Sequence, residues 1–213
     1  MALNNQNKCI FILSPHVDDG ELGCGGTISK LVAENNDVHF AVFSLAEKSI
    51  PSEFPKDTTE KEFYESMKVL KIPKSNIHLF NFEVRNFPLK RQEILEILRG
   101  INKDYSPGIV FTPSLNDLHQ DHEVVAKETA RAFKTTTIFC YEEPWNLITF
   151  NITSLVRLTQ DHVEKKVEAL RCYKSQSHRP YFEEDFTWNL AKMRGFLINH
   201  PYAEAFEILR LIV

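Results

Sequence analysis

The stretch CIFILSPHVDDGELGCGG, residues 9–26, joins the pattern of a buried strand to the pattern of a helix. Its first seven residues are an apolar run that ends in Ser and Pro, which is typical of a central parallel strand covered on both faces. From about Glu21 to Asn35, apolar residues recur at helical spacing, so the charged turn before them lies at the carboxyl end of the strand. A histidine, two adjacent aspartates and a glutamate crowd this turn, which indicates a functional site.

Strand and helix patterns alternate along the chain up to residue 145. The expected strands are residues 9–15, 37–45, 76–82, 107–114 and 135–145, and the expected helices between them are residues 21–35, 58–72, 88–105 and 120–133. Thr59, three residues before Glu62, gives the second helix a capping signature. The alternation predicts an α/β fold with a Rossmann-like, doubly wound, mostly parallel sheet and helices on both faces. In the common strand order 3-2-1-4-5, the first and fourth strands are neighbours, so the loops that follow them meet.

We expect a single domain over residues 1–213, with 1–145 as the Rossmann-like core and 146–213 as C-terminal elements that complete the ligand cleft. The expected C-terminal elements are a strand near 150–157 and helices near 160–173 and 185–199. The apolar tail EILRLIV, residues 207–213, leaves a homo-oligomer open, although we favour packing of this tail onto the chain's own core.

The composition argues against several kinds of partner and location. The chain has 25 Lys and Arg against 29 Asp and Glu, a formal net charge of −4, so nothing favours a nucleic-acid backbone as partner. A phosphate-bearing small molecule remains compatible with this charge. No apolar run reaches the roughly 18 residues of a membrane span, and residues 1–8 lack the features of a signal peptide. We therefore expect a cytoplasmic protein.

Four cysteines, Cys9, Cys24, Cys140 and Cys172, lie far apart and form no CxxC pair. This spacing predicts neither a structural zinc knuckle nor a disulfide framework, so we expect reduced and mostly buried thiols. A nucleophilic Cys24 is disfavoured, because the carboxylates beside it raise a thiol pKa and suppress the thiolate.

Two clusters of histidine and carboxylate follow the two strands that we expect to be neighbours. His16 and Asp19 are three residues apart in the first strand-to-helix turn, and His119 and His122 are three apart near a helix start, with Asp121 between them. Imidazole and carboxylate without thiolate suit Zn²⁺ or Fe²⁺. Either cluster alone is more often a group of surface side chains, but their placement after adjacent strands favours one joint metal site.

The donor types also predict a reaction class. If three of these groups bind the ion, open positions remain for water and substrate, and bound water reaches a pKa near ~7. The aspartate and histidine that remain are then available for proton transfer and charge stabilisation. The residues therefore predict metal-assisted hydrolysis.

The glycines of GELGCGG, residues 20–26, resemble a phosphate-binding loop only superficially. Carboxylates at Asp18, Asp19 and Glu21 directly before them would repel a diphosphate, so we expect the glycines to allow close packing of the first helix. Glu21 itself has two open roles, a hydrogen bond to the turn or a favourable charge at the helix N-terminus.

The segments PHVDDGELGCGG, residues 15–26, and HQDH, residues 119–122, resemble the two signatures of the PIG-L/LmbE-like deacetylases. The segments KKVEALRCYKSQ, residues 165–176, and YAEAFEILR, residues 202–210, are similar to elements near the C-terminal ends of these enzymes. The resemblance implies a zinc-dependent N-deacetylase, with Fe²⁺ or another divalent ion as alternatives. It also implies hydrolysis of a small N-acetylated, N-acetylglucosamine-type sugar or sugar conjugate by attack of a metal-bound water on the amide.

Residue by residue, the resemblance implies that His16, Asp19 and His122 bind the metal. Asp18 would be the general base that activates the water and later gives its proton to the departing amine. His119 would be an imidazolium that stabilises the oxyanion. Asp121 would hold that ring and favour its charged form, because a nearby carboxylate raises a histidine pKa.

The chain departs from the family pattern at two positions. Val17 replaces the usual proline, which removes some rigidity from the turn but no catalytic group, and Gly20 replaces a frequent glutamate. The placement of Glu21 resembles the branch that includes the bacillithiol-pathway deacetylases.

Other polar side chains are candidates for substrate binding, and for each a structural role stays open. The predicted contacts are Arg85, Arg91, Glu143 and His178, and further residues placed to line the cleft are Glu142, Trp145, Asn146 and Arg179. The histidines interpreted as structural are His39, His78, His162 and His200. Two other functions remain open: an amidohydrolase acting on a non-sugar N-acyl amine, and a nucleotide- or carbohydrate-binding module without catalysis.

Overall fold

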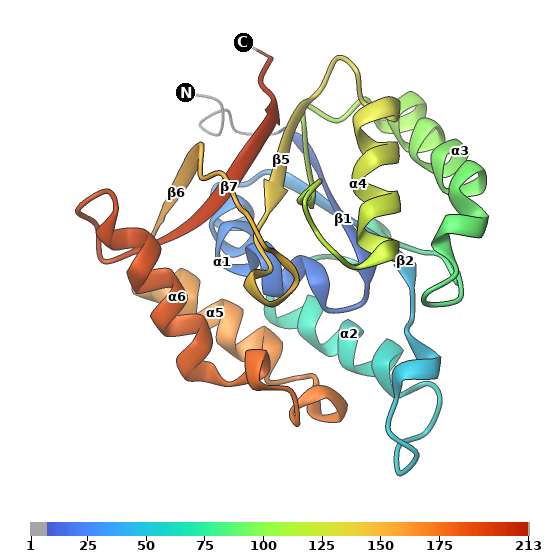
Figure 1. The fold of residues 1–213 in the computed structure, drawn as a ribbon. Coiled ribbons are helices and arrows are strands. Elements are labelled where there is room, and N and C mark those ends of the chain that lie inside the picture. Colours follow the sequence, from blue (N-terminus) through green and yellow to red (C-terminus); the bar gives the residue numbers. More distant parts are fainter. Residues whose placement is uncertain (1–7, 213) are drawn as a thin grey trace.

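The computed structural model describes residues 8–212 and contains a seven-stranded sheet with the order β3-β2-β1-β4-β5-β7-β6 (Figure 1). The strands are β1 (Cys9–His16), β2 (Asp37–Ser44), β3 (Ile77–Leu79), β4 (Ile109–Pro113), β5 (Thr137–Tyr141), β6 (Ser154–Leu158) and β7 (Tyr202–Arg210). The first five strands are parallel in the predicted order, and β7 runs antiparallel to both β5 and β6. Residues 1–7 and Val213 lie outside the described residues. Residues 1–7 are most of the segment in which we expect no signal peptide.

Helices cover both faces of the sheet, as predicted. They are α1 (Asp19–Ala33), α2 (Thr58–Val69), α3 (Phe87–Tyr105), α4 (Gln120–Ala132), α5 (Gln160–Leu170) and α6 (Glu184–Phe196). Helices α3 and α4 pack on one face, and α1, α2, α5 and α6 pack on the other (Figure 1). None of the helices within residues 8–212 combines the length and the apolar character needed to cross a membrane.

Strand β1 is buried on both faces, which explains its continuous apolar run. Ile10 and Ile12 belong to the core cluster under α1 and α2, whereas Phe11 and Leu13 belong to the cluster under α3 and α4. All four side chains are fully buried, and each such burial stabilises the fold by about 1.5–3 kcal/mol. This central strand fixes His16 at its carboxyl end.

Strand β7 lies between β5 and β6, so the C-terminal segment is part of the same sheet. Residues Glu207–Arg210 of the apolar tail belong to this strand, in agreement with packing onto the chain's own core, while Leu211 and Ile212 are about half exposed. The sequence analysis did not predict β7. A strand that is covered on both faces of the sheet does not show a clear alternation of apolar and polar residues.

Helix α1 is interrupted at Cys24, where a carboxylate from β7 caps its second part. The backbone N–H groups of Gly26 and Thr27 donate to Glu204 Oε1 (3.0 Å) and Oε2 (2.6 Å), and Lys166 Nζ donates to Oε1 at 2.8 Å. A Cβ atom on Gly26 would lie 2.6 Å from the side chain of Leu158. The expectation that the glycines permit close packing is confirmed.

The predicted capping role of Thr59 and Glu62 is wrong. Asp57 precedes the first turn of α2, and the Thr59 hydroxyl donates to the backbone oxygen of Leu45 at 2.6 Å. The Glu62 carboxylate accepts hydrogen bonds from the backbone N–H (2.9 Å) and hydroxyl (2.6 Å) of Ser175. Each polar group is therefore engaged in its own tertiary contact, which the local sequence does not reveal.

Replacing Glu204 with alanine is expected to destabilise the fold by about 3–5 kcal/mol, because it leaves a buried ammonium group and two backbone N–H groups without their acceptor. Glu164→Ala on the exposed side of α5 is the matched control, with an expected change within about 0.5 kcal/mol. Urea unfolding followed by circular dichroism measures both variants. Equal unfolding midpoints would contradict the capping role of Glu204.

Candidate metal centre

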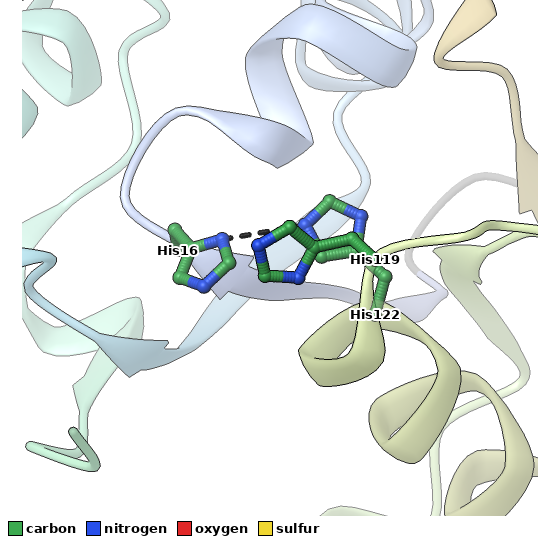
Figure 2. A group of neighbouring side chains, drawn as sticks. All are labelled: His16, His119 and His122. Carbon is green, nitrogen blue, oxygen red and sulfur yellow. Dashed lines mark hydrogen bonds between the residues drawn. The ribbon is translucent and has the colours of Figure 1, made fainter. Parts of the chain in front are cut away.

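The parallel pairing of β1 and β4 brings the two predicted clusters together at one edge of the sheet. His16 Nδ1 lies 3.1 Å from Asp19 Oδ2, His122 Nε2 lies 3.2 Å from the same oxygen, and the two ring nitrogens are 3.3 Å apart. A tetrahedral ion with bonds of about 2.0–2.2 Å holds its ligand atoms roughly 3.3–3.5 Å apart. Figure 2 shows the rings of His16, His119 and His122 together, with the contact between His16 and His122 dashed. The three donor atoms therefore form a triangle that fits a divalent ion.

Two overlapping sets of donors surround this triangle. In one, His119 joins His16 and His122, and in the other Glu143 joins Asp19 and His122, with ligand atoms within 4.8 Å of one another in each set. His119 comes from the residue before α4, and Glu143 follows β5. The centre is therefore built from the ends of three neighbouring strands.

Outer carboxylates hold both histidine rings. His16 Nε2 contacts Asp121 Oδ2 at 3.1 Å, and His122 Nδ1 contacts Asp117 Oδ2 at 2.9 Å. A ring N–H that donates to a carboxylate leaves its lone pair on the other nitrogen, and this arrangement is characteristic of metal-binding histidines. Each lone pair then lies on the nitrogen that faces the triangle. The donor set and its supports thus fit a divalent metal.

Asp117 is a candidate functional residue that the sequence analysis missed. Its Oδ1 accepts the backbone N–H of His119 at 2.8 Å while its Oδ2 holds His122, so it both shapes the turn and orients a donor ring. An aspartate in the turn before HQDH looks like ordinary turn chemistry in the sequence, because this residue type often accepts a backbone N–H two positions later.

Buried carboxylates make the centre strongly attractive to positive charge. Burial opposes protonation of His16, but Asp19 and Asp121 outweigh it and raise the pKa of His16 to about 9. The pKa of His122 is likewise raised against the effect of burial by Asp19 and Glu143, and the two histidines hold the pKa of Asp19 well below its usual range despite burial.

Asp18 lies beside this cluster and lines the cavity that opens onto it. Burial, and then the charge of Asp19, raise the pKa of Asp18 to about 6. A carboxyl group with a pKa in this range exchanges protons readily near neutral pH, as a general base requires.

The prediction that the carboxylate of Asp121 holds the ring of His119 is wrong. Asp121 Oδ2 accepts the backbone N–H of Arg85 at 2.6 Å besides contacting His16, and Oδ1 accepts the N–H of Phe87 at 3.2 Å. The fully buried carboxylate instead joins α4, the end of β1 and the start of α3. Arg85 adopts a left-handed φ of 68°, a strained conformation that its N–H bond to Asp121 helps to hold.

His119 is held by a backbone group. Its Nδ1 accepts the N–H of Asp121 at 3.2 Å, so the proton of the neutral ring lies on Nε2. Burial, and then the neighbouring rings of His122 and His16, lower the pKa of His119 to about 4. In the structure the ring is therefore a neutral hydrogen-bond donor, unlike the expected imidazolium.

The cavity separates the predicted substrate contacts into two groups. Arg85 and Glu143 line it, together with Trp145, Asn146, Gln176, Arg179 and Tyr181. Arg91 does not line it, because its guanidinium pairs with Glu128 at 2.9 Å on the face of α3 and α4. His178 is exposed and lies outside the cavity lining, although its neighbour Arg179 contributes to it.

Glu21 lies behind the cavity and supports the turn that carries Asp18 and Asp19. Its Oε1 accepts the hydroxyl of Ser66 at 2.7 Å and lies 2.6 Å from Tyr173 Oη, which is itself 2.5 Å from the backbone oxygen of Val17. Tyr173 has one hydroxyl hydrogen, which it can donate to the backbone oxygen of Val17. The contact with Glu21 is then a hydrogen bond only if Glu21 is protonated and donates to Tyr173 Oη. Burial raises the pKa of Glu21 to about 8, in agreement with this arrangement.

The cysteines take no part in the centre. All four are free, and Cys24 lies at the interruption of α1 outside the cavity lining. Burial, and then the charge of Glu204, raise the pKa of the Cys24 thiol well above its usual value. A nucleophilic role for this thiol has no structural support.

The chain is similar in sequence to known deacetylases. The chain is 27% identical over 177 residues to an uncharacterized deacetylase, YaiS, of Escherichia coli K12, with 80% of this chain and 93% of that protein covered. It is 26% identical over 224 residues to a diacetylchitobiose deacetylase of Thermococcus kodakarensis, with coverage of 94% and 82%.

The fold is also that of solved structures. The N,N'-diacetylchitobiose deacetylase of Pyrococcus horikoshii superposes with a TM-score of 0.80 at 23% identity, covering 95% of this chain and 84% of that one. The model of the PIG-L family, described as GlcNAc-PI de-N-acetylase, matches residues 11–133. This match spans more than half of the chain and includes both histidine–carboxylate clusters. The chain therefore belongs to the PIG-L family.

Proposed function

We propose that this protein is a divalent-metal-dependent N-deacetylase that removes the acetyl group from an N-acetylated amino sugar of the N-acetylglucosamine type, or from its conjugate. The observation that carries this proposal is the triangle of His16 Nδ1, Asp19 Oδ2 and His122 Nε2, with Asp18 beside it in the same cavity. Family membership and the names of the diacetylchitobiose deacetylases of Thermococcus kodakarensis and Pyrococcus horikoshii support the choice of an acetylated sugar.

Zn²⁺ is the metal that we propose, since two histidines and one carboxylate form a common catalytic zinc set, and the same donors also suit Fe²⁺. An ion held by these three residues would supply a Lewis acid that polarises the amide carbonyl and makes water more acidic. Asp117 and Asp121 keep the two donor rings in the tautomers that such an ion needs.

Asp18 takes the proton of the attacking water and later passes it to the amine that leaves. Its position in the cavity next to the donor triangle, and its pKa of about 6, suit both transfers. His119 donates its Nε2 proton in a hydrogen bond to the amide oxygen as negative charge develops there. Asp121 acts through His16 and Arg85 and is a positioning residue.

The remaining cavity wall supplies contacts for the sugar. The rings of Trp145 and Tyr181 stack with centroids 4.1 Å apart and an interplanar angle of 8°, and both residues line the cavity. We propose Arg85 and Glu143, which line the same cavity, as polar contacts for the sugar. Arg91 and His178 are not included, because neither lines the cavity.

The proposed roles predict the metal content and the activity of the wild type and of three variants. Purified protein should hold one divalent ion per chain and release acetate from at least one N-acetylglucosamine derivative. His122→Ala should lose both the ion and the activity, whereas Asp18→Asn and His119→Ala should keep the ion and lose activity by about 10²–10⁴-fold. Metal analysis measures the bound ion, and an acetate assay on the same samples measures the activity.

His78→Ala in β3, outside the cavity, is the matched histidine control and should retain ion and activity. Loss of the ion in His119→Ala would show that the roles are divided wrongly. Protein that binds no ion and releases no acetate from any derivative would refute the proposal.

Asp117→Asn is expected to weaken metal binding by about 10–100-fold, because it removes the charge that holds the N–H of His122. Competition with a chromophoric chelator measures the affinity. Asn116→Ala changes the adjacent exposed position and should bind the metal as the wild type does. Equal affinities for all three proteins would contradict the orienting role of Asp117.

A further inference from the structure

A second group of metal-binding residue types lies at the amino ends of β1 and β2, at the opposite end of the sheet from the donor triangle. Cys9, Asp37 and His39 each offer one ligand atom, and these atoms all lie within 4.8 Å of one another. The two ends of β1 are about 23 Å apart at the usual rise of ~3.3 Å per residue. None of the three residues lines the cavity that opens onto the triangle, so this group is separate from the proposed catalytic centre.

Strand register places the three side chains on one face of the sheet. Cys9 begins β1 and has Asp37, the first residue of β2, as its register partner. His39 follows two residues later on β2, and residues two apart in a strand share a face. Cys9 packs against the core cluster under α3 and α4, and Phe11 of that cluster stacks on the His39 ring with centroids 4.9 Å apart. The three donors therefore lie on the α3 side of the sheet.

The His39 ring is fixed in position by its neighbours and is buried. Its Nδ1 lies 3.3 Å from His78 Nε2, and its Nε2 lies 3.0 Å from Asp37 Oδ2. Tyr105, the last residue of α3, contacts both imidazole rings, with centroid distances of 5.1 Å to His39 and 5.2 Å to His78. When Nδ1–H donates to His78, the lone pair of His39 lies on Nε2, beside the carboxylate. An outer hydrogen-bond acceptor of this kind is characteristic of metal-binding histidines.

The charges around this group favour a cation. Burial opposes ionisation of Asp37, but hydrogen bonds with His39 and Asn76 outweigh it and lower the pKa of this carboxyl group. The carboxyl end of α3, at Tyr105, adds the negative end of a helix dipole. Burial, and then the charge of Asp37, raise the pKa of the Cys9 thiol to about 11, so the sulfur keeps its proton at neutral pH without an ion. A bound divalent ion replaces that proton, because a coordinating thiol is deprotonated.

We propose that Cys9, Asp37 and His39, the last through Nε2, form a second divalent-metal site, with His78 as the outer partner that orients the His39 ring. Thiolate, imidazole and carboxylate together suit Zn²⁺ and Co²⁺, whereas Mg²⁺ prefers oxygen ligands only. The donors are less closely set than those of the donor triangle, whose atoms are 3.1–3.3 Å apart, so the second site fills after the triangle. An ion here links the amino ends of β1 and β2. The site goes beyond the proposed deacetylase and does not depend on it.

The test is a titration of the metal-free full chain with Co²⁺ in the presence of a phosphine reductant. A cobalt–thiolate bond gives an intense charge-transfer absorption in the near ultraviolet, and the donor triangle contains no sulfur that could produce it. The band should therefore be absent during the first equivalent of Co²⁺ and grow during the second. Added Zn²⁺ should abolish the band by displacing Co²⁺, whereas the same excess of Mg²⁺ should leave it unchanged.

Four variants assign the band to this site. Cys9→Ser should abolish it and still bind the first equivalent, whereas Cys172→Ser, which removes another partly buried cysteine, is the matched control and should keep it. His122→Ala, in which the donor triangle is incomplete, should develop the band during the first equivalent. His78→Ala should keep the first equivalent and weaken binding of the second by about 10–100-fold.

Asp37→Ala tests the site without a change in the core, because this side chain is 58% exposed. It should keep the circular dichroism spectrum of the wild type and bind the second Co²⁺ at least about tenfold more weakly. A wild type that develops no band with two equivalents, a band that persists in Cys9→Ser, or an unchanged affinity in Asp37→Ala would each overturn the proposal. A lack of acetate release would refute the proposed function alone, since the band reports only the bond between cobalt and sulfur.

Discussion

Buried negative charge at the carboxyl ends of β1 and β4 is the constraint on which the rest of this structure depends. Asp19, Asp117 and Asp121 are all at most 6% exposed, and buried carboxylates are tolerated only with hydrogen bonds and compensating positive charge. The hydrogen bonds come from the rings of His16 and His122 and from backbone N–H groups. The arrangement that satisfies the carboxylates also points two imidazole lone pairs and one carboxylate oxygen at a common point, which is the geometry of the candidate metal site.

Other buried carboxylates hold the frame around this centre. Glu204 on β7 caps the interrupted helix α1, Glu62 on α2 anchors the segment at Ser175, and Glu21 joins Tyr173 to the turn after β1. Each of these contacts connects the C-terminal part of the chain to the first 70 residues. The cavity wall that carries Arg179 and Tyr181 is therefore positioned against the metal centre by specific polar contacts as well as by apolar packing.

Much of the fold was predictable, because a parallel sheet covered on both faces leaves continuous apolar runs separated by helical periodicity. The same pattern placed His16 and His122 at the ends of neighbouring strands. The errors concern side-chain partners. The carboxylate of Asp121 contacts His16 and two backbone N–H groups instead of the ring of His119, and Arg91 turns to Glu128 instead of the cavity. The spacing of residues in the sequence indicates which residues come near each other. It does not indicate which of their atoms form hydrogen bonds or ion pairs.

By itself, the sequence determined the alternating α/β order, the two clusters of metal-binding residue types and the close packing that the glycines of the first helix permit. These features follow from periodicity and residue chemistry, which are local properties of the chain. Only the tertiary structure decided the donor triangle, the outer role of Asp117 and the position of β7 between β5 and β6. The physical reason is that hydrogen bonds and ion pairs form between atoms within a few ångströms, and those distances are set by how remote segments pack.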